Sequence, residues 1–71
     1  MSITAVNVRN QIRGTVREIV RSPVVSEIVI DTGSGLITSV ITTRSVNDLG
    51  LEVGSPVVAL IKSTEVSIAV L

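Results

Sequence analysis

The stretch that decides the fold is QIRGTVREIVR, residues 11–21. In its first half Ile12, Gly14 and Val16 alternate with polar residues, which is the two-residue period of a half-buried β-strand. After Val16 the apolar positions change parity. A β-bulge inserts one extra residue and shifts the side chains that follow to the other face. The stretch therefore predicts one long strand with a bulge or sharp bend near Glu18.

Outward from this stretch, further apolar runs alternate with turn residues. Val24–Asp31 (VVSEIVID) and Leu36–Thr43 (LITSVITT) are rich in β-branched residues and predict the next two strands. Between them, Thr32–Gly35 (TGSG) has the glycines of a tight hairpin. The residues after the third strand predict a short helix, capped by Ser45 and ended by Gly50 in a left-handed conformation.

Two more short strands are expected, over Val57–Ile61 (VVALI) and Val66–Leu71 (VSIAVL). The order is then three strands, a short helix and two strands, in a single domain that covers residues 1–71. Five short strands with a helix between the third and the fourth are typical of a small OB-type barrel. The sequence therefore predicts an all-β, OB-like five-stranded barrel with one short helix between strands 3 and 4.

The composition excludes several classes of protein. The chain has 71 residues, with six basic and six acidic side chains, no His, no Cys and no aromatic residue. A Ser-His-Asp triad, a thiol nucleophile and a Cys/His metal site are impossible, and no tuned acid/base pair stands out. Without aromatic platforms or net positive charge, no nucleic-acid partner is expected. We therefore expect a protein that is not an enzyme and that holds no metal cation through direct side-chain ligands.

The apolar residues are too many for so small a monomer to bury. Hydrophobic residues make up 45% of the chain, and a domain of this size buries only about 60% of its unfolded surface. Since disulfides and Cys/His metal sites are excluded, oligomerisation is the expected extra support. The predicted strand Val57–Ile61 is apolar on both faces, whereas a barrel strand buries only one. We therefore expect a homo-oligomer in which a neighbouring subunit covers the second face.

No apolar run approaches the roughly 20 residues that a bilayer-spanning helix needs. The longest such run is Val57–Ile61. Residues 1–13 alternate small, polar and basic side chains and contain no apolar core of a signal peptide. We therefore expect no membrane partner and a cytoplasmic location.

Three polar clusters interrupt the apolar pattern and offer hydrogen-bond donors. They are Asn7–Gln11, Thr38–Ser39 and Lys62–Thr64. Arg and Lys side chains only donate, and hydroxyl and carboxamide groups can also donate. A pocket made of such groups suits a small, fully deprotonated oxyanion such as molybdate or sulfate. Taken singly, each cluster is also what an ordinary exposed surface carries, so the pattern alone leaves both interpretations open.

Taken together, the three clusters resemble the signatures of the molbindins, the Mop family of small molybdate-binding proteins. The same TOBE/Mop unit is an accessory domain of molybdate-responsive regulators and transport ATPases. The matching segments are Asn7–Gly14 (NVRNQIRG), Ile37–Ile41 (ITSVI) followed by Ser45-Val46 and Leu49-Gly50, and Ala59–Val66 (ALIKSTEV). They occur in the family's order with matching gaps, and the resemblance covers essentially the whole chain.

The resemblance implies a function, an assembly and a set of binding residues. Members of the family have an OB-like barrel and assemble as hexamers, trimers of dimers, that exchange strands and bind oxyanions at subunit interfaces. It implies storage or homeostatic buffering of molybdate or tungstate as a bound ligand, with no covalent cofactor. The residues that it assigns to oxyanion binding are Asn7, Val8, Arg9, Thr38, Ser39, Lys62 and Ser63.

Within this set, Arg9 and Lys62 would supply positive charge, and the other residues would supply hydrogen bonds from hydroxyl, amide and backbone groups. Asn7 stands where the family usually has Ser, and Val8 stands where it usually has Ala. Both side chains are larger than the usual ones and change the size of the site. They leave a second function open, in which the chain is a structural oligomerisation module whose anion sites are vestigial or of a sulfate type.

Overall fold

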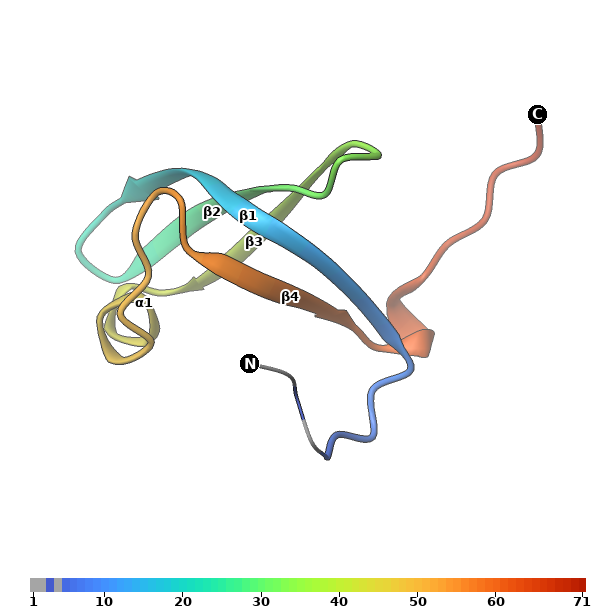
Figure 1. The fold of residues 1–71 in the computed structure, drawn as a ribbon, viewed down its shortest axis with the longest axis horizontal. Helices are drawn as coiled ribbons and strands as arrows, with labels where there is room; N and C mark the ends of the chain where they lie inside the picture. Colours follow the sequence, from blue (N-terminus) through green and yellow to red (C-terminus); the bar gives the residue numbers. More distant parts are fainter. Residues whose placement is uncertain (1–2, 4) are drawn as a thin grey trace.

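An antiparallel sheet in the order β3-β2-β1-β4 organises the protein (Figure 1). The computed structural model describes residue 3 and residues 5–71. The elements are β1 (Asn10–Arg21), β2 (Val25–Asp31), β3 (Leu36–Thr42), α1 (Thr43–Asp48), β4 (Pro56–Ile61) and the 3₁₀ turn η1 (Ser63–Glu65). The predicted β character and the short helix between the third and fourth strands are confirmed. Among these described residues, no helix is long and apolar enough to cross a membrane.

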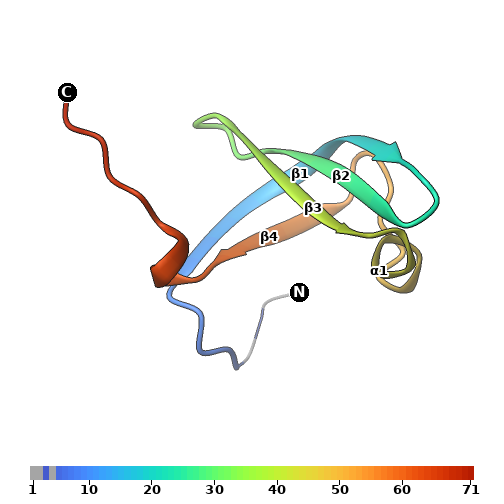
Figure 2. The ribbon, with the colours of Figure 1, turned by 180° about the vertical axis from the view of Figure 1, so that it is seen from behind.

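β1 is long enough to pair with two neighbours. Its first half, Asn10–Thr15, pairs with β4, and its second half pairs with β2. The register against β2 shifts between Val16 and Glu18, so the predicted bulge is confirmed. Bulges bend a strand and increase its local twist. The sheet consequently curls, as two opposite views show (Figures 1 and 2).

The curl brings β1 and β2 very close together at Gly14. A Cβ at this position would lie 2.6 Å from Cγ2 of Ile30 and 2.7 Å from the carbonyl oxygen of Asp31. A side chain there would force one of the strands to move. Gly14 therefore marks a close backbone approach, which is a common reason for glycine inside a strand.

The core lies on the concave face of the curled sheet. Its buried side chains come from three strands and the helix, and they are Val16, Ile28, Ile30, Val46 and Ala59. Val46 is fully buried, and through it α1 covers one end of the sheet (Figure 1). The buried hydroxyl of Ser26 lies 2.7 Å from Oγ1 of Thr43, so the first residue of α1 is also tied to β2 by a hydrogen bond.

α1 begins earlier than the sequence predicted. Its N-cap is Thr42, whose Oγ1 accepts a hydrogen bond from the backbone N–H of Ser45 at 3.1 Å. The prediction of Ser45 as the cap is wrong, because Thr42 is the hydroxyl residue with the extended backbone that a cap requires. Asp48 is consequently the last helical residue and takes no part in a capping box. Gly50 follows with φ of 62°, in the left-handed region as predicted.

Replacing Thr42 with alanine is expected to lower the free energy of unfolding by about 1 kcal/mol, because it removes the acceptor for the Ser45 amide. Ser45→Ala is the matched control. It removes a hydroxyl that bonds the Thr42 hydroxyl at 2.8 Å and leaves the cap acceptor in place, so its loss should be smaller. Urea unfolding at a fixed protein concentration measures both. An equal or larger loss for Ser45→Ala would contradict the assignment of the cap.

The predicted fifth strand, Val66–Leu71, does not form within this chain. After η1, residues 66–71 run away from the sheet (Figures 1 and 2). The side chains of Ile68 and Val70 are 91% and 94% exposed. A strand needs an edge to pair with, and this segment reaches neither edge of its own sheet. The described part of the chain is therefore a four-stranded half-barrel, and the five-stranded OB-like barrel is not built by one chain alone.

An apolar groove lies on the concave face between the two edge strands, β3 and β4. Its volume is about 280 Å³. The apolar side chains that line it include Ile30, Ile37, Ile41, Leu51, Val57 and Ile61. We call it the β3–β4 groove. A half-barrel with this groove open leaves much of its concave apolar face only half-buried.

Candidate anion site

The N-terminal segment and the segment after β4 meet at one end of the sheet. Asn10, at the start of β1, pairs with Ile61, at the end of β4, and its Nδ2 also donates to the Ile61 carbonyl oxygen at 3.0 Å. Because the two strands are antiparallel, the residues before Asn10 and after Ile61 extend past the same end of the ladder. Between them lies a pocket of about 300 Å³, which we call the terminal pocket. It is lined by Asn7, Val8, Arg9, Lys62, Ser63 and Thr64.

Local hydrogen bonds shape both walls of the terminal pocket. On the N-terminal wall, Nε2 of Gln11 donates to the carbonyl oxygen of Val8 at 2.9 Å. On the other wall, the backbone N–H of Glu65 donates to the carbonyl oxygen of Lys62 at 2.9 Å and closes the η1 turn. Each wall is thus a short loop whose shape is held by its own sequence.

The terminal pocket combines two cations with several neutral donors. Arg9 and Lys62 come from opposite ends of the chain, and both side chains are exposed. The hydroxyl groups of Ser63 and Thr64 and the carboxamide of Asn7 can add hydrogen bonds. None of the six lining residues is acidic. A small oxyanion here would meet charge-assisted hydrogen bonds without a carboxylate in the wall to repel it.

The structure brings together most of the residues that the sequence assigned to oxyanion binding. Asn7, Val8, Arg9, Lys62 and Ser63 all line the terminal pocket. Thr38 and Ser39 do not line it. They lie on β3, which forms the other edge of the sheet from β4. There they line the β3–β4 groove, which lies between these two edge strands. Within one chain, the Thr38–Ser39 cluster is therefore separate from the other two.

Three residues at the terminal pocket were not assigned to oxyanion binding from the sequence. Thr64 lines it, and the signal for this residue was its place in the polar run that begins at Lys62. Asn10 and Gln11 form hydrogen bonds that shape its walls. They belonged to the first polar cluster, but no role followed from the sequence, because the fold decides which carbonyl groups their side chains reach.

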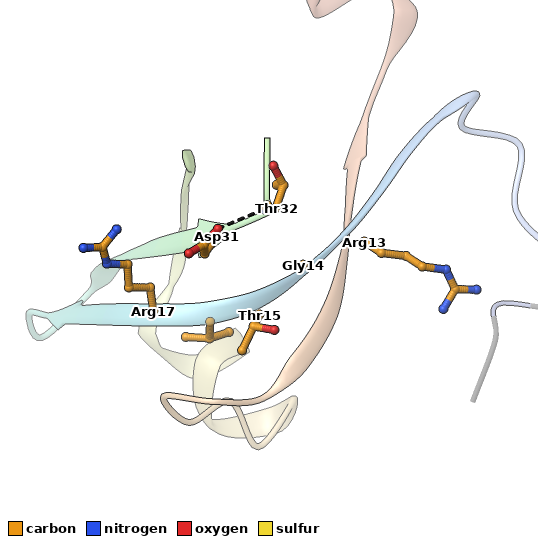
Figure 3. Close-up of a pocket in the computed structure, with 8 residues that line it drawn as sticks. Arg13, Gly14, Thr15, Arg17, Asp31 and Thr32 are labelled. Carbon is orange, nitrogen blue, oxygen red and sulfur yellow. Dashed lines mark hydrogen bonds between the residues drawn. The ribbon is translucent and has the colours of Figure 1, made fainter. Parts of the chain in front are cut away.

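A second pocket, of about 580 Å³, lies where β1 passes the turn between β2 and β3 (Figure 3). Arg13 and Arg17 line it, but their side chains extend to opposite sides of the strand (Figure 3). Asp31 also lines it, and its Oδ1 accepts a hydrogen bond from the Gly33 N–H at 2.9 Å. The two guanidinium groups of this pocket therefore do not converge, and its lining includes a carboxylate.

A curled antiparallel sheet, with a donor-lined pocket where the segment before β1 meets the segment after β4, defines a small β domain suited to holding an anion. The chain belongs to the TOBE domain family, which matches residues 7–68. The predicted relationship to the Mop proteins is confirmed by the relatives and solved structures that follow.

Molybdenum-pterin-binding protein 3 of Clostridium pasteurianum is 41% identical over 69 residues, which cover 96% of this chain and 97% of that protein. The molybdenum-pterin-binding protein MopB of Rhodobacter capsulatus is 44% identical over 64 residues, which cover 89% of this chain and 24% of that protein. The structure of MopII from Clostridium pasteurianum is similar with a TM-score of 0.86 and 36% identity, covering 93% of this chain and 100% of that one. A molybdate-binding protein from Sporomusa ovata has a TM-score of 0.84 and 39% identity, covering 97% and 98% of the two chains.

Proposed function

We propose that this protein binds molybdate, or the closely similar tungstate, for storage or homeostatic buffering and catalyses no reaction. The observation that carries the proposal is the terminal pocket, where Arg9 and Lys62 stand on opposite walls and no lining residue is acidic. The ligands named for the relatives support the choice of anion, since these are molybdenum-pterin-binding and molybdate-binding proteins. The proposal includes no covalent cofactor and places the protein in the cytoplasm.

The chemistry of the lining suits an anion without protons. Molybdate is a tetrahedral dianion whose four oxygens accept hydrogen bonds and donate none. Arg and Lys are donors only, and their bonds to an ionised acceptor are about twice as strong as neutral ones. These bonds offset the cost of removing the dianion from water. Sulfate has the same charge and shape as molybdate but is smaller. The size of the pocket must therefore provide the selectivity for molybdate over sulfate.

We further propose a homo-oligomer in which residues 66–71 of one chain occupy the β3–β4 groove of another. The segment is apolar along one face, through Val66, Ile68 and Val70. Six extended residues span about 20 Å, which matches the lengths of the flanking strands, seven and six residues. Both flanking strands are edges with free backbone groups. An inserted segment would supply the fifth strand that the sequence predicts.

Such an exchange would place the terminal pocket at a boundary between subunits. Lys62–Thr64 lie directly before the exchanged segment, while Thr38 and Ser39 line the groove that would receive it. We propose that Thr38 and Ser39 of one chain join the anion site through this contact. A hexamer, built as a trimer of dimers, is the assembly that the family resemblance predicts.

One observation favours a second candidate function. Asn7 and Val8 both line the terminal pocket, in place of the smaller Ser and Ala of the family signature. The larger side chains reduce the room for a molybdate ion. In this alternative the chain is a structural oligomerisation module with vestigial or sulfate-type anion sites.

Calorimetric titration of the 71-residue protein with molybdate, tungstate and sulfate tests the proposal, with the oligomeric mass measured on the same sample. We expect molybdate and tungstate to bind at least about tenfold more tightly than sulfate, because a pocket of fixed size discriminates by such factors. The expected mass is that of a homo-oligomer. Failure of molybdate to bind would overturn the proposal, and equal or tighter binding of sulfate would support the alternative. A monomer at micromolar concentration would contradict the interface site.

A further inference from the structure

Two consecutive residues at the start of β1, Asn10 and Gln11, carry carboxamide side chains and directly follow the lining residue Arg9 of the terminal pocket. Asn10 is half-buried, and its Nδ2 donates across to the carbonyl oxygen of Ile61 at 3.0 Å. Gln11 is exposed, and its Nε2 donates back to the carbonyl oxygen of Val8 at 2.9 Å. Gln11 thus engages the carbonyl of a residue that lines the terminal pocket. Asn10 engages the carbonyl of Ile61, which lines the β3–β4 groove and directly precedes Lys62 of the terminal pocket.

These two carbonyl groups matter for the kind of anion that the pocket can hold. A carbonyl oxygen is an acceptor and carries partial negative charge. A free carbonyl beside the pocket would repel an anion that has only acceptor oxygens. The same carbonyl would attract an anion that carries an O–H group, because it could accept that proton in a hydrogen bond. A hydrogen bond from a side-chain amide N–H to the carbonyl oxygen reduces both the repulsion of the first kind of anion and the attraction of the second.

The two hydrogen bonds also hold the pocket in different ways. The Asn10 bond joins positions 51 residues apart and fastens the N-terminal wall to the end of β4. The Gln11 bond spans three residues and fixes the bend that presents Arg9. Both bonds thus engage residues directly next to the two cations, since Val8 precedes Arg9 and Ile61 precedes Lys62.

We infer that Asn10 and Gln11 are positioning residues that make the terminal pocket selective for a fully deprotonated oxyanion over a protonated one. This inference rests on the proposed function. Neither side chain is assigned a contact with the anion. Each acts through the backbone carbonyl that it engages, Asn10 through Ile61 and Gln11 through Val8.

The test compares Asn10→Ala and Gln11→Met with the wild-type protein. Both variants remove the amide donor without adding charge, and Gln11→Met keeps the length of an exposed side chain, so it should fold. Molybdate affinity is measured by calorimetry, and phosphate affinity by competition against bound molybdate, at about pH 8, where phosphate carries one proton. Asn47→Ala is the matched control, because it removes one exposed hydrogen bond, from Arg21 Nη1 at 2.9 Å, in α1.

We expect each variant to bind molybdate roughly two- to tenfold more weakly, as loss of one hydrogen bond predicts. Phosphate affinity should fall less, so that the preference for molybdate over phosphate narrows, and the control should change neither. An equal loss for both anions would show a merely structural role and overturn the inference, as would unchanged affinities. If the wild-type protein binds no molybdate, the proposed function fails first and the inference fails with it.

Discussion

Replacing Lys62 with alanine is expected to weaken the proposed molybdate binding roughly 10- to 150-fold while leaving the proposed oligomer intact. The ammonium group is one of two cations in the terminal pocket, and a hydrogen bond to a charged group contributes about 1.5–3 kcal/mol. The side chain is exposed and follows the last residue of β4, so its removal should disturb neither the core nor the sheet. Calorimetric titration with molybdate measures the change in affinity, and light scattering measures the mass.

Arg13→Ala is the matched control for Lys62→Ala. Arg13 is also an exposed cation on the edge of a pocket, but that pocket is the one beside the β2–β3 turn. If general attraction to a positive surface produced the binding, both variants would lose similar affinity and both losses would shrink with added salt. Unchanged molybdate affinity in Lys62→Ala would remove this residue from the site.

Deleting residues 66–71 is expected to convert the proposed homo-oligomer to monomers. The deleted segment is exposed within its own chain, so its loss removes no part of the described core. In the proposed exchange it fills the β3–β4 groove of another chain, and without it that apolar groove stays open to water. Light scattering would report the lower mass, and binding of a hydrophobic dye would report the exposed groove. The truncated protein should also bind molybdate more weakly, because the site would lose its neighbouring chain.

Two point variants refine the truncation experiment. Alternation along the segment puts Val66, Ile68 and Val70 on one face, and it puts Ser67, Ala69 and Leu71 on the other. Ile68→Lys should therefore dissociate the oligomer nearly as well as the deletion, whereas Ser67→Lys should be tolerated. An unchanged mass after the deletion would mean that some other surface holds the subunits together.

Most of the sheet could be predicted because its determinants are local. The alternation of Ile12, Gly14 and Val16 and the later change of parity depend only on neighbouring residues, so both β1 and its bulge were predictable. Gly50 was predictable as a left-handed residue for the same reason. The helix cap was not, because several hydroxyl residues lie close together there and only the backbone conformation decides that Thr42 is the cap.

The candidate site and the fifth strand depend on contacts between distant residues. Donor-rich clusters near both chain ends were visible in the sequence, but only the pairing of Asn10 with Ile61 brings Arg9 and Lys62 to one pocket. The apolar and β-branched residues of segment 66–71 predict a strand, but the segment forms no strand within its own chain. The sequence of this segment does not say which chain supplies the edge strand that it would pair with. Within its own chain the segment pairs with no strand.

The division of the terminal pocket between the two ends of the chain has a consequence for synthesis. Its walls are separated by β1, β2, β3, α1 and β4, and the ladder that joins them pairs Asn10 with Ile61 across 51 residues. A ribosome must therefore translate all five of these elements before the second wall exists. Contacts between residues so far apart in sequence have a high entropic cost of loop closure and tend to form late. A growing chain accordingly lacks the terminal pocket until Lys62–Thr64 have been made, and the anion binding that we propose there starts only after that point.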